Sequence, residues 1–381
     1  MVKEIIRRIL LLLIFSCFFF VFAFDSSAAS FVRVAVFKDA SKLTLDVDAS
    51  FRITTVEDDL ELLKLDKASG LLIETIDKGF NIGSNNIGKE RIEITRDDDG
   101  FISINDRLFR GRLRFIKKDA SNFFVVNYIE LEDYIRGVLY HEISHLWPEE
   151  SIKAQAVVVR TFALSKMHDN RLKEYDLTND TYSQVYGGRT SERWRTNKGV
   201  DATGGEVLKL DGKIFPTYYH AACGGHTEDV SNLWDVDIAS LKGVTCPYCA
   251  DSPHFKWDIY IDFKRLQEKL NAAGLRVGKI ESIEIVERSL SNRVLKLKII
   301  SATDTIEISG KALREILGPK ILRSTNFQIE SSGDFVLFKG FGWGHGVGLC
   351  QWGAYFMGKQ GHDYRQILEY YYHGAKIEKD Y

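Results

Sequence analysis

The segment from Leu131 to Met167 constrains the fold of this chain more than any other feature. Its apolar residues recur at helical spacing, and Glu142 falls on the same helical face as they do, among Leu131, Ile135, Val138 and Leu139. Burial of a carboxylate raises its pKa toward neutrality. A buried glutamate can pair with a cation for structural reasons alone. A raised pKa also suits a general acid that holds a proton near neutral pH.

The same segment contains the letters of a zinc-peptidase motif. His141 to His145 reads H-E-x-x-H, which on a continuous helix sets two imidazoles one turn apart, with the glutamate as general base. Pro148 weakens this interpretation because it predicts that the helix stops close to His145. A second amphipathic helix is predicted to run to about Met167. A zinc peptidase using His141, Glu142 and His145 is our third functional hypothesis.

Residues 1–29 have the pattern of an export signal. Basic residues precede an apolar run over residues 9–24, and Ala28-Ala29 offers small residues for cleavage. The run is short for a full membrane span. We expect an exported protein in the cell envelope or outside the cell, and an uncleaved anchor through residues 9–24 is the alternative.

Charge and composition narrow the choice of partners. The chain has 51 basic and 53 acidic residues, mixed along its length, for a net charge of −2. We therefore expect no nucleic-acid partner, because such proteins concentrate positive charge on one surface. With 45% hydrophobic and 27% charged residues, the composition is that of a globular protein.

The pattern of short runs predicts an α+β fold. Alternating and β-branched runs over residues 30–128 predict a β-rich N-terminal region. Residues 129–254 are expected to form a core with a central helical catalytic segment. Strand and helix patterns alternate over residues 255–335, which indicates a small α+β insertion. Residues 336–381, rich in glycine and aromatic residues, are expected to complete the core.

Four residues have the spacing of a structural zinc site. His220 and Cys223 form H-x2-C, and Cys246 and Cys249 form C-x2-C, so four nitrogen and sulfur ligands are available. In an exported protein, Cys223 can instead form a disulfide with Cys246 or Cys249. The sequence leaves zinc and disulfide open. Either link would be structural, and we expect the chemistry to need no cofactor.

Glycines occupy every second position from Gly340 to Gly348, which predicts that another group approaches this backbone closely. Trp343, His345 and Gln351, together with Trp352, bring flat apolar faces and polar tips, the surface that binds a sugar. Cys350 lacks an identifiable base that would activate it as a nucleophile. We assign it to the core as a small residue.

Taken together, these segments resemble the SpoIID/LytB family, the group of sporulation stage II protein D and the amidase enhancers. The matching motifs run in the family's order over about residues 129–377: EDYIRGV from Glu132, Glu142, WPE from Trp147, KAQA from Lys153 through Arg160-Thr161, SQVYGG from Ser183, ATGG from Ala202, Tyr219-His220, GGHTE from Gly224 and GFGWGHGVGLCQWGA from Gly340. Cys350 stands where a serine is usual.

The resemblance implies a lytic transglycosylase that cuts peptidoglycan, with Glu142 as the catalytic glutamate and Arg160 as an active-site arginine. We expect Arg160 to orient Glu142 or to bind an acidic group of the sugar, if the second helix folds back beside the first. Gln184 and Tyr219, which stand in matching motifs, join Trp343, His345 and Gln351 as candidate substrate-binding residues.

Our leading hypothesis is cleavage of the MurNAc–GlcNAc bond to 1,6-anhydro-muramic ends. Glu142 would protonate the glycosidic oxygen and then accept the proton of the muramic C6 hydroxyl. The resemblance also implies an alternative: a non-catalytic glycan-binding protein that enhances a cell-wall amidase.

Overall fold

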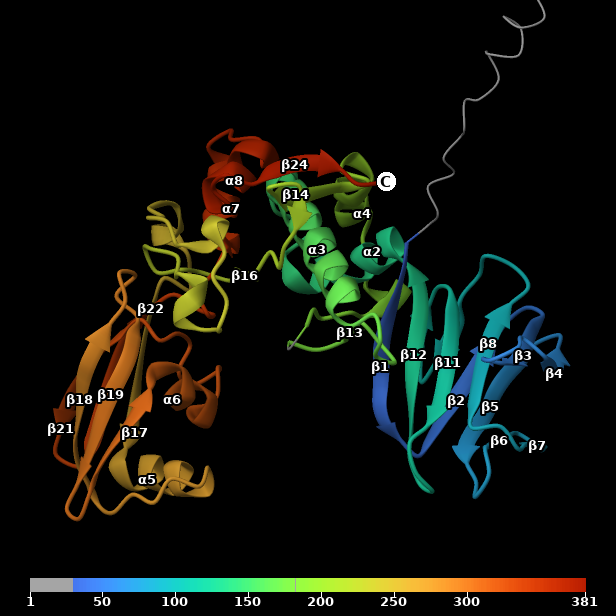
Figure 1. The fold of residues 1–381 in the computed structure, drawn as a ribbon, viewed down its shortest axis with the longest axis horizontal. Helices are drawn as coiled ribbons and strands as arrows, with labels where there is room; N and C mark the ends of the chain where they lie inside the picture. The colour runs from blue at the N-terminus through green and yellow to red at the C-terminus, as the bar shows by residue number, and fades with distance from the viewer. Residues whose placement is uncertain (1–29, 182) are drawn as a thin grey trace, which may run out of the picture. The chain divides into compact units, whose positions relative to one another are not determined.

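The computed structural model describes residues 30–181 and 183–381 (Figure 1). The expected export signal of residues 1–29, including the alternative anchor over residues 9–24, lies outside the described residues. Within the described ranges, no helix combines the length and the apolar character that a membrane span requires.

The N-terminal region is built from twelve successive strands. They are β1 (Phe31–Ala40), β2 (Lys42–Val47), β3 (Phe51–Thr55), β4 (Glu61–Leu65), β5 (Ala68–Thr75), β6 (Phe80–Ile82), β7 (Asn85–Ile87), β8 (Arg91–Arg96), β9 (Ile102–Ile104), β10 (Arg107–Phe109), β11 (Arg112–Lys117) and β12 (Phe123–Glu130). With β13 (Leu177–Thr178), they form a seven-stranded sheet in the order β13-β1-β12-β11-β8-β3-β4 and a six-stranded sheet in the order β10-β9-β2-β5-β6-β7.

Aromatic side chains join these two sheets. The ring of Phe80 on β6 forms T-shaped contacts with Phe115 on β11 and Phe123 on β12, with centroid distances of 6.4 and 5.5 Å. Side chains of β11 alternate between buried and partly exposed along most of the strand, as expected for a sheet with one face on a core. The predicted α+β class and the β-rich N-terminal region are confirmed.

The central helices follow β12 without a connecting loop. Helix α2 (Leu131–Glu142) begins with acidic residues in its first turn, which complement the positive end of the helix dipole. It ends at Glu142 because Ile143 is extended, with φ −139° and ψ 156°. Pro148 caps α3 (Glu149–Asp169), and α4 (Trp194–Ala202) packs against α3, where Gly199 leaves room for Ile152.

The segments that complete this core come from distant parts of the chain. Strand β14 (Glu206–Leu210) pairs with β15 (Lys213–Ile214) and with β24 (Lys376–Lys379), and Figure 1 shows β14 beside β24. Strand β16 (Tyr219–His220) pairs in parallel with β23 (Leu349–Cys350). Helices α7 (Gln351–Lys359) and α8 (Tyr364–Tyr371) then pack on α3.

The insertion has a hydrophobic core of its own. Its elements are β17 (Lys256–Asp262), α5 (Phe263–Ala272), β18 (Ile280–Arg288), β19 (Val294–Ser301), β20 (Thr305–Ser309), α6 (Gly310–Leu317), β21 (Phe327–Ser332) and β22 (Phe335–Phe341). They form two three-stranded sheets, β17-β22-β21 and β18-β19-β20, over buried residues such as Leu266, Leu297, Leu313 and Phe338. Because β17 and β22 pair along their whole length, the insertion begins and ends on neighbouring strands.

Candidate active site

Glu142 faces a cavity of about 260 Å³ at the C-terminal end of α2. The wall is largely aromatic, and its aromatic side chains come from α3, β16 and three loops: Phe162, Tyr218, Tyr219, His220, Trp234 and His345. The rings of Tyr218 and Trp234 are stacked, with centroids 4.4 Å apart. A carboxylate thus lies in an apolar pocket large enough to admit part of a ligand.

Burial raises the pKa of Glu142 above its ordinary value. The negative end of the α2 dipole acts in the same direction. Two hydrogen bonds oppose the shift: the Val185 backbone N–H donates to Oε1 over 3.1 Å, and the Tyr219 hydroxyl bonds to the same carboxyl group. Across the described ranges, no basic side chain forms an ion pair with Glu142. The structural explanation of a buried glutamate paired with a cation therefore does not apply here.

Gln184 and Tyr219 support Glu142 as a connected pair. The side chain of Gln184 is buried, accepts a hydrogen bond from the Tyr134 hydroxyl over 2.9 Å and contacts Tyr219. Tyr219 in turn bonds to Glu142. Tyr219 lines the cavity, as a substrate-binding residue should, but Gln184 lies behind it and holds it in place.

Gln351 also acts on Glu142 from behind. Its Nε2 donates to the main-chain carbonyl of Glu142 over 3.2 Å, which satisfies one of the carbonyls left open at the end of α2. Only 7% of Gln351 is exposed. The structure therefore gives this residue a positioning contact in place of the predicted contact with sugar.

The side chains of His345 and Trp343 lie in different surroundings, although both residues belong to the glycine-rich segment. His345 lines the cavity, and burial, aided by the charges of Arg314 and Arg293, lowers its pKa to about 3. It is neutral at physiological pH and can offer a hydrogen bond but no charge. The ring of Trp343 does not line this cavity. It packs against His254, at a centroid distance of 4.8 Å, and under the guanidinium of Arg323.

Arg160 does not orient Glu142, which corrects the sequence-based expectation. Its guanidinium is fully buried and forms two hydrogen bonds with the carboxylate of Glu132, over 2.7 and 2.8 Å, and a third with the carbonyl of Glu206. Glu132 and Glu142 are ten residues apart on α2, about 15 Å along the helix axis. Arg160 therefore ties α3 to the start of α2, at the end remote from the cavity.

The H-E-x-x-H segment does not form a metal site. Because α2 ends at Glu142, His145 lies beyond the helix and the required spacing of one turn is not formed. His141 bonds to the hydroxyl of Ser191 over 2.6 Å, and both histidine rings contact Tyr140. The zinc-peptidase hypothesis is therefore wrong.

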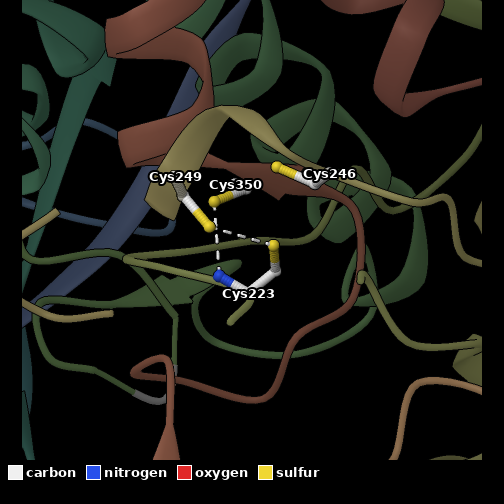
Figure 2. A group of neighbouring side chains, drawn as sticks. All are labelled: Cys223, Cys246, Cys249 and Cys350. Atoms are coloured by element: carbon white, nitrogen blue, oxygen red, sulfur yellow. Dashed lines mark hydrogen bonds between the residues drawn. The ribbon is translucent and has the colours of Figure 1, made fainter. Parts of the chain in front are cut away.

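The three cysteines of the predicted zinc site lie close together, but the fourth residue of the group is Cys350 and not His220. The Sγ atoms of Cys223, Cys246, Cys249 and Cys350 all lie within 4.8 Å of one another, and all four residues are buried and free of disulfides (Figure 2). His220 is outside this group. Its Nδ1 bonds to the Val347 carbonyl, and its Nε2, beside the Glu142 cavity, is buried and has no hydrogen-bond partner in the part of the chain that the structure describes. Cys350 is buried as expected, but it belongs to the sulfur cluster.

Three aromatic residues of the cavity wall were not predicted as site residues. Tyr218 stands next to Tyr219 in sequence, so the motif could have suggested it. Phe162 lies on the predicted second helix, where periodicity marks a residue as buried without distinguishing core from cavity wall. Trp234 lies in an irregular loop between Asn232 and Ala239, where no periodic pattern gives a signal.

Comparisons with known proteins place these elements among relatives. The family model described as Stage II sporulation protein matches residues 119–210, and the model described as a domain of unknown function (DUF8618) matches residues 246–348. An uncharacterized protein of Brachyspira hyodysenteriae is 32% identical over 347 residues, which cover 91% of this chain and 92% of the relative.

Two relatives from Bacillus subtilis have descriptive names. Stage II sporulation protein D is 29% identical over 276 residues, covering 67% of this chain and 76% of the relative. The amidase enhancer is 24% identical over 291 residues, covering 64% of this chain and 40% of the relative.

Proposed function

This chain belongs to the SpoIID/LytB family, and we propose that it acts on the bacterial cell wall as a lytic transglycosylase that cleaves peptidoglycan glycan strands. The observation that carries the proposal is the state of Glu142: half-buried at the wall of a cavity, raised in pKa and, among the described residues, not paired with a cation. Such a carboxyl group holds a proton that it can give to a glycosidic oxygen.

The surroundings of Glu142 suit both halves of the reaction. Burial favours the protonated form before the bond breaks. After the proton has left, the Val185 N–H and the Tyr219 hydroxyl stabilise the carboxylate. The carboxylate then accepts the proton of the muramic C6 hydroxyl as that oxygen attacks C1, which closes the 1,6-anhydro ring.

One carboxylate is enough for this route. Glycosidases that use water place a second carboxyl group about 5–10 Å from the first, as nucleophile or as base. Among the described residues that line the cavity, Glu142 is the sole acidic one. This arrangement favours an intramolecular attack by the substrate over hydrolysis. The aromatic wall formed by Tyr218 and Trp234 offers an apolar surface for a sugar ring.

The name of the amidase enhancer relative favours a second candidate function. In that case the same cavity would bind glycan without cutting it, and the protein would stimulate a cell-wall amidase. Both functions place the protein outside the cytoplasm. We propose that residues 1–29 direct its export. The alternative is that residues 9–24 stay uncleaved and anchor the protein in the membrane.

Analysis of product ends tests the proposal. The protein is incubated with purified glycan strands, with and without stem peptides, and the products are identified by mass spectrometry. We expect 1,6-anhydro-muramic ends, and at least about 100-fold fewer of them with the Glu142→Gln variant. Reducing ends would indicate a hydrolase with a second carboxylate. Glycan binding without any product, combined with faster cleavage by an added amidase, would indicate the enhancer.

A further inference from the structure

The buried sulfur cluster is formed by three segments that are distant in sequence (Figure 2). Cys223 follows β16. Cys246 precedes the short helix η4 (Tyr248–Asp251) and Cys249 lies within it, and Cys350 is the last residue of β23. Four thiols that meet from three segments inside a core form a single group. Their mutual approach needs a physical cause, because a thiol gains little from packing against three others.

The spacing of the sulfurs fits one tetrahedral ion. A zinc ion with Zn–S distances of about 2.3 Å would separate its ligands by about 3.8 Å. The Sγ atoms of Cys223 and Cys249 are 3.4 Å apart, and none of the four is more than 4.8 Å from another. That volume admits a single ion, whereas a cluster of several iron and sulfide ions needs more room.

The surroundings supply the donors that a thiolate site requires. The backbone N–H groups of Cys223 and Gly353 both donate to the Sγ of Cys350, each over 3.3 Å, and the Tyr371 hydroxyl contacts the Sγ of Cys246 over 3.1 Å. Gly353 is required for this approach, because a Cβ there would lie 1.9 Å from the Tyr371 hydroxyl. Hydrogen bonds of this kind orient and stabilise the ligands of a metal.

A buried cation beside the cluster is compatible with a negatively charged metal site. Arg293 on the insertion is 1% exposed, and its hydrogen-bond partners within the described ranges are neutral: the carbonyls of Cys223 and His226 and the hydroxyl of Ser291. A buried guanidinium is costly unless negative charge lies nearby, and the buried carboxylate of Glu228, which accepts a hydrogen bond from the same Ser291 hydroxyl, supplies one such charge. Four thiolates around one divalent ion would add a net charge of −2 next to Cys223, whose carbonyl Arg293 contacts.

We propose that Cys223, Cys246, Cys249 and Cys350 bind one zinc ion in a closed, tetrahedral, structural site. Four thiolates leave no open position for water or substrate, and soft sulfur ligands in this geometry select zinc among the common divalent ions. The site is distinct from the Glu142 cavity and takes no part in proton transfer.

The ion would hold together one wall of that cavity, a consequence that rests on the proposed function. Cys350 pairs with His220 across β16 and β23, and Tyr219, the adjacent residue of β16, bonds to Glu142. The residue after Cys350 is Gln351, which holds the carbonyl of Glu142. A metal at Cys350 therefore fixes both contacts from one point.

Metal content tests the site without reference to activity. Protein purified without chelator is analysed by plasma mass spectrometry, and its cobalt-substituted form is examined by absorption spectroscopy. We expect one zinc per chain and, with cobalt, intense thiolate-to-metal bands with the visible bands of a tetrahedral ion. The Glu142→Gln variant should give the same values, which separates this test from that of the proposed function.

Two variants identify the fourth ligand. Cys350→Ser keeps a side-chain acceptor at the start of α7, and we expect it to lower zinc affinity at least 100-fold. His220→Gln should keep one zinc per chain. Loss of zinc in His220→Gln with retention in Cys350→Ser would overturn the ligand set. If Cys350→Ser does not fold, the cobalt spectrum of the unaltered protein still shows whether thiolates bind the ion in a tetrahedral site.

Thiol titration covers the remaining outcomes. Denatured, chelated protein should show all four cluster thiols as free, with Cys17 as a fifth where residues 1–29 are retained. Two or four fewer free thiols, without metal, would show that the cysteines form disulfides and would overturn the proposal. One equivalent of iron in place of zinc would overturn the choice of ion.

Discussion

Helix α2 has a glutamate near each end, and the two have opposite environments. Glu132, in the first turn, is held by two hydrogen bonds from the buried guanidinium of Arg160. Glu142, the last residue, lies in an aromatic cavity, and its hydrogen-bond donors among the described residues are neutral. The comparison teaches that burial alone does not define a catalytic carboxylate. The partner decides whether the group is fixed as an anion or can exchange a proton.

The largest effect is expected from Glu142→Gln, which keeps the shape of the side chain and removes the acid. Cleavage of glycan strands should fall by about 10²–10⁴-fold, the contribution typical of a general acid and base. The measurement is the rate of release of soluble fragments.

Stability provides the control for this variant. A raised pKa means that the folded state binds the proton more tightly than the unfolded state. Its contribution to stability is complete below the ordinary pKa of a glutamate and declines as pH rises through the folded value. Glu142→Gln should therefore be at least as stable as the parent protein at pH 7. A folded variant with near-normal turnover would remove Glu142 from the mechanism.

Arg160→Met should act on stability and leave the chemistry at Glu142 intact. It leaves Glu132 without its buried partner, and breaking a buried ion pair costs about 3–5 kcal/mol. Denaturant unfolding measures this loss. The matched control is Lys339→Met, which breaks the exposed pair with Glu330 at 2.7 Å and should cost less than about 1 kcal/mol. Arg160→Met with normal stability but no cleavage would return Arg160 to the active site.

Tyr219→Phe tests the pKa of Glu142 through the pH dependence of cleavage. The hydrogen bond from Tyr219 lowers the pKa of Glu142, so its removal should raise that pKa further. Because cleavage requires the protonated carboxyl group, activity falls as pH rises through this pKa. The alkaline limb of the pH–rate profile should move to higher pH, by about one unit for a hydrogen bond to a charged group. A shift to lower pH would contradict the assigned contact.

The smallest effect is expected from His141→Ala and His145→Ala. Neither histidine lines the cavity, and His145 lies outside α2. Turnover should change less than about twofold and stability by about 0.5 kcal/mol, as for most surface substitutions. A large loss of cleavage in both variants would show that the end of α2 depends on them.

Local patterns predicted the helices and the place of Glu142 at the end of the first of them, because periodicity and Pro148 are properties of a few neighbouring residues; the side chain itself is only half-buried. Long-range pairing was predicted less well. A fold-back near Pro148 sets residues at similar distances from the turn against each other, which matches Arg160 with Glu132 rather than with Glu142. The exchange of His220 for Cys350 depends on the pairing of β16 with β23, and no spacing within either strand encodes that register.

The contact between Gln351 and Glu142 joins residues separated by 209 positions. His345 and the partner strand of β16 also come from the last forty residues of the chain. A nascent chain that lacks this segment contains Glu142 but not the complete cavity around it. The order of synthesis therefore delays activity. The cavity is complete only after the C-terminal portion has been synthesised and has packed against the rest of the chain, and shorter fragments are inactive.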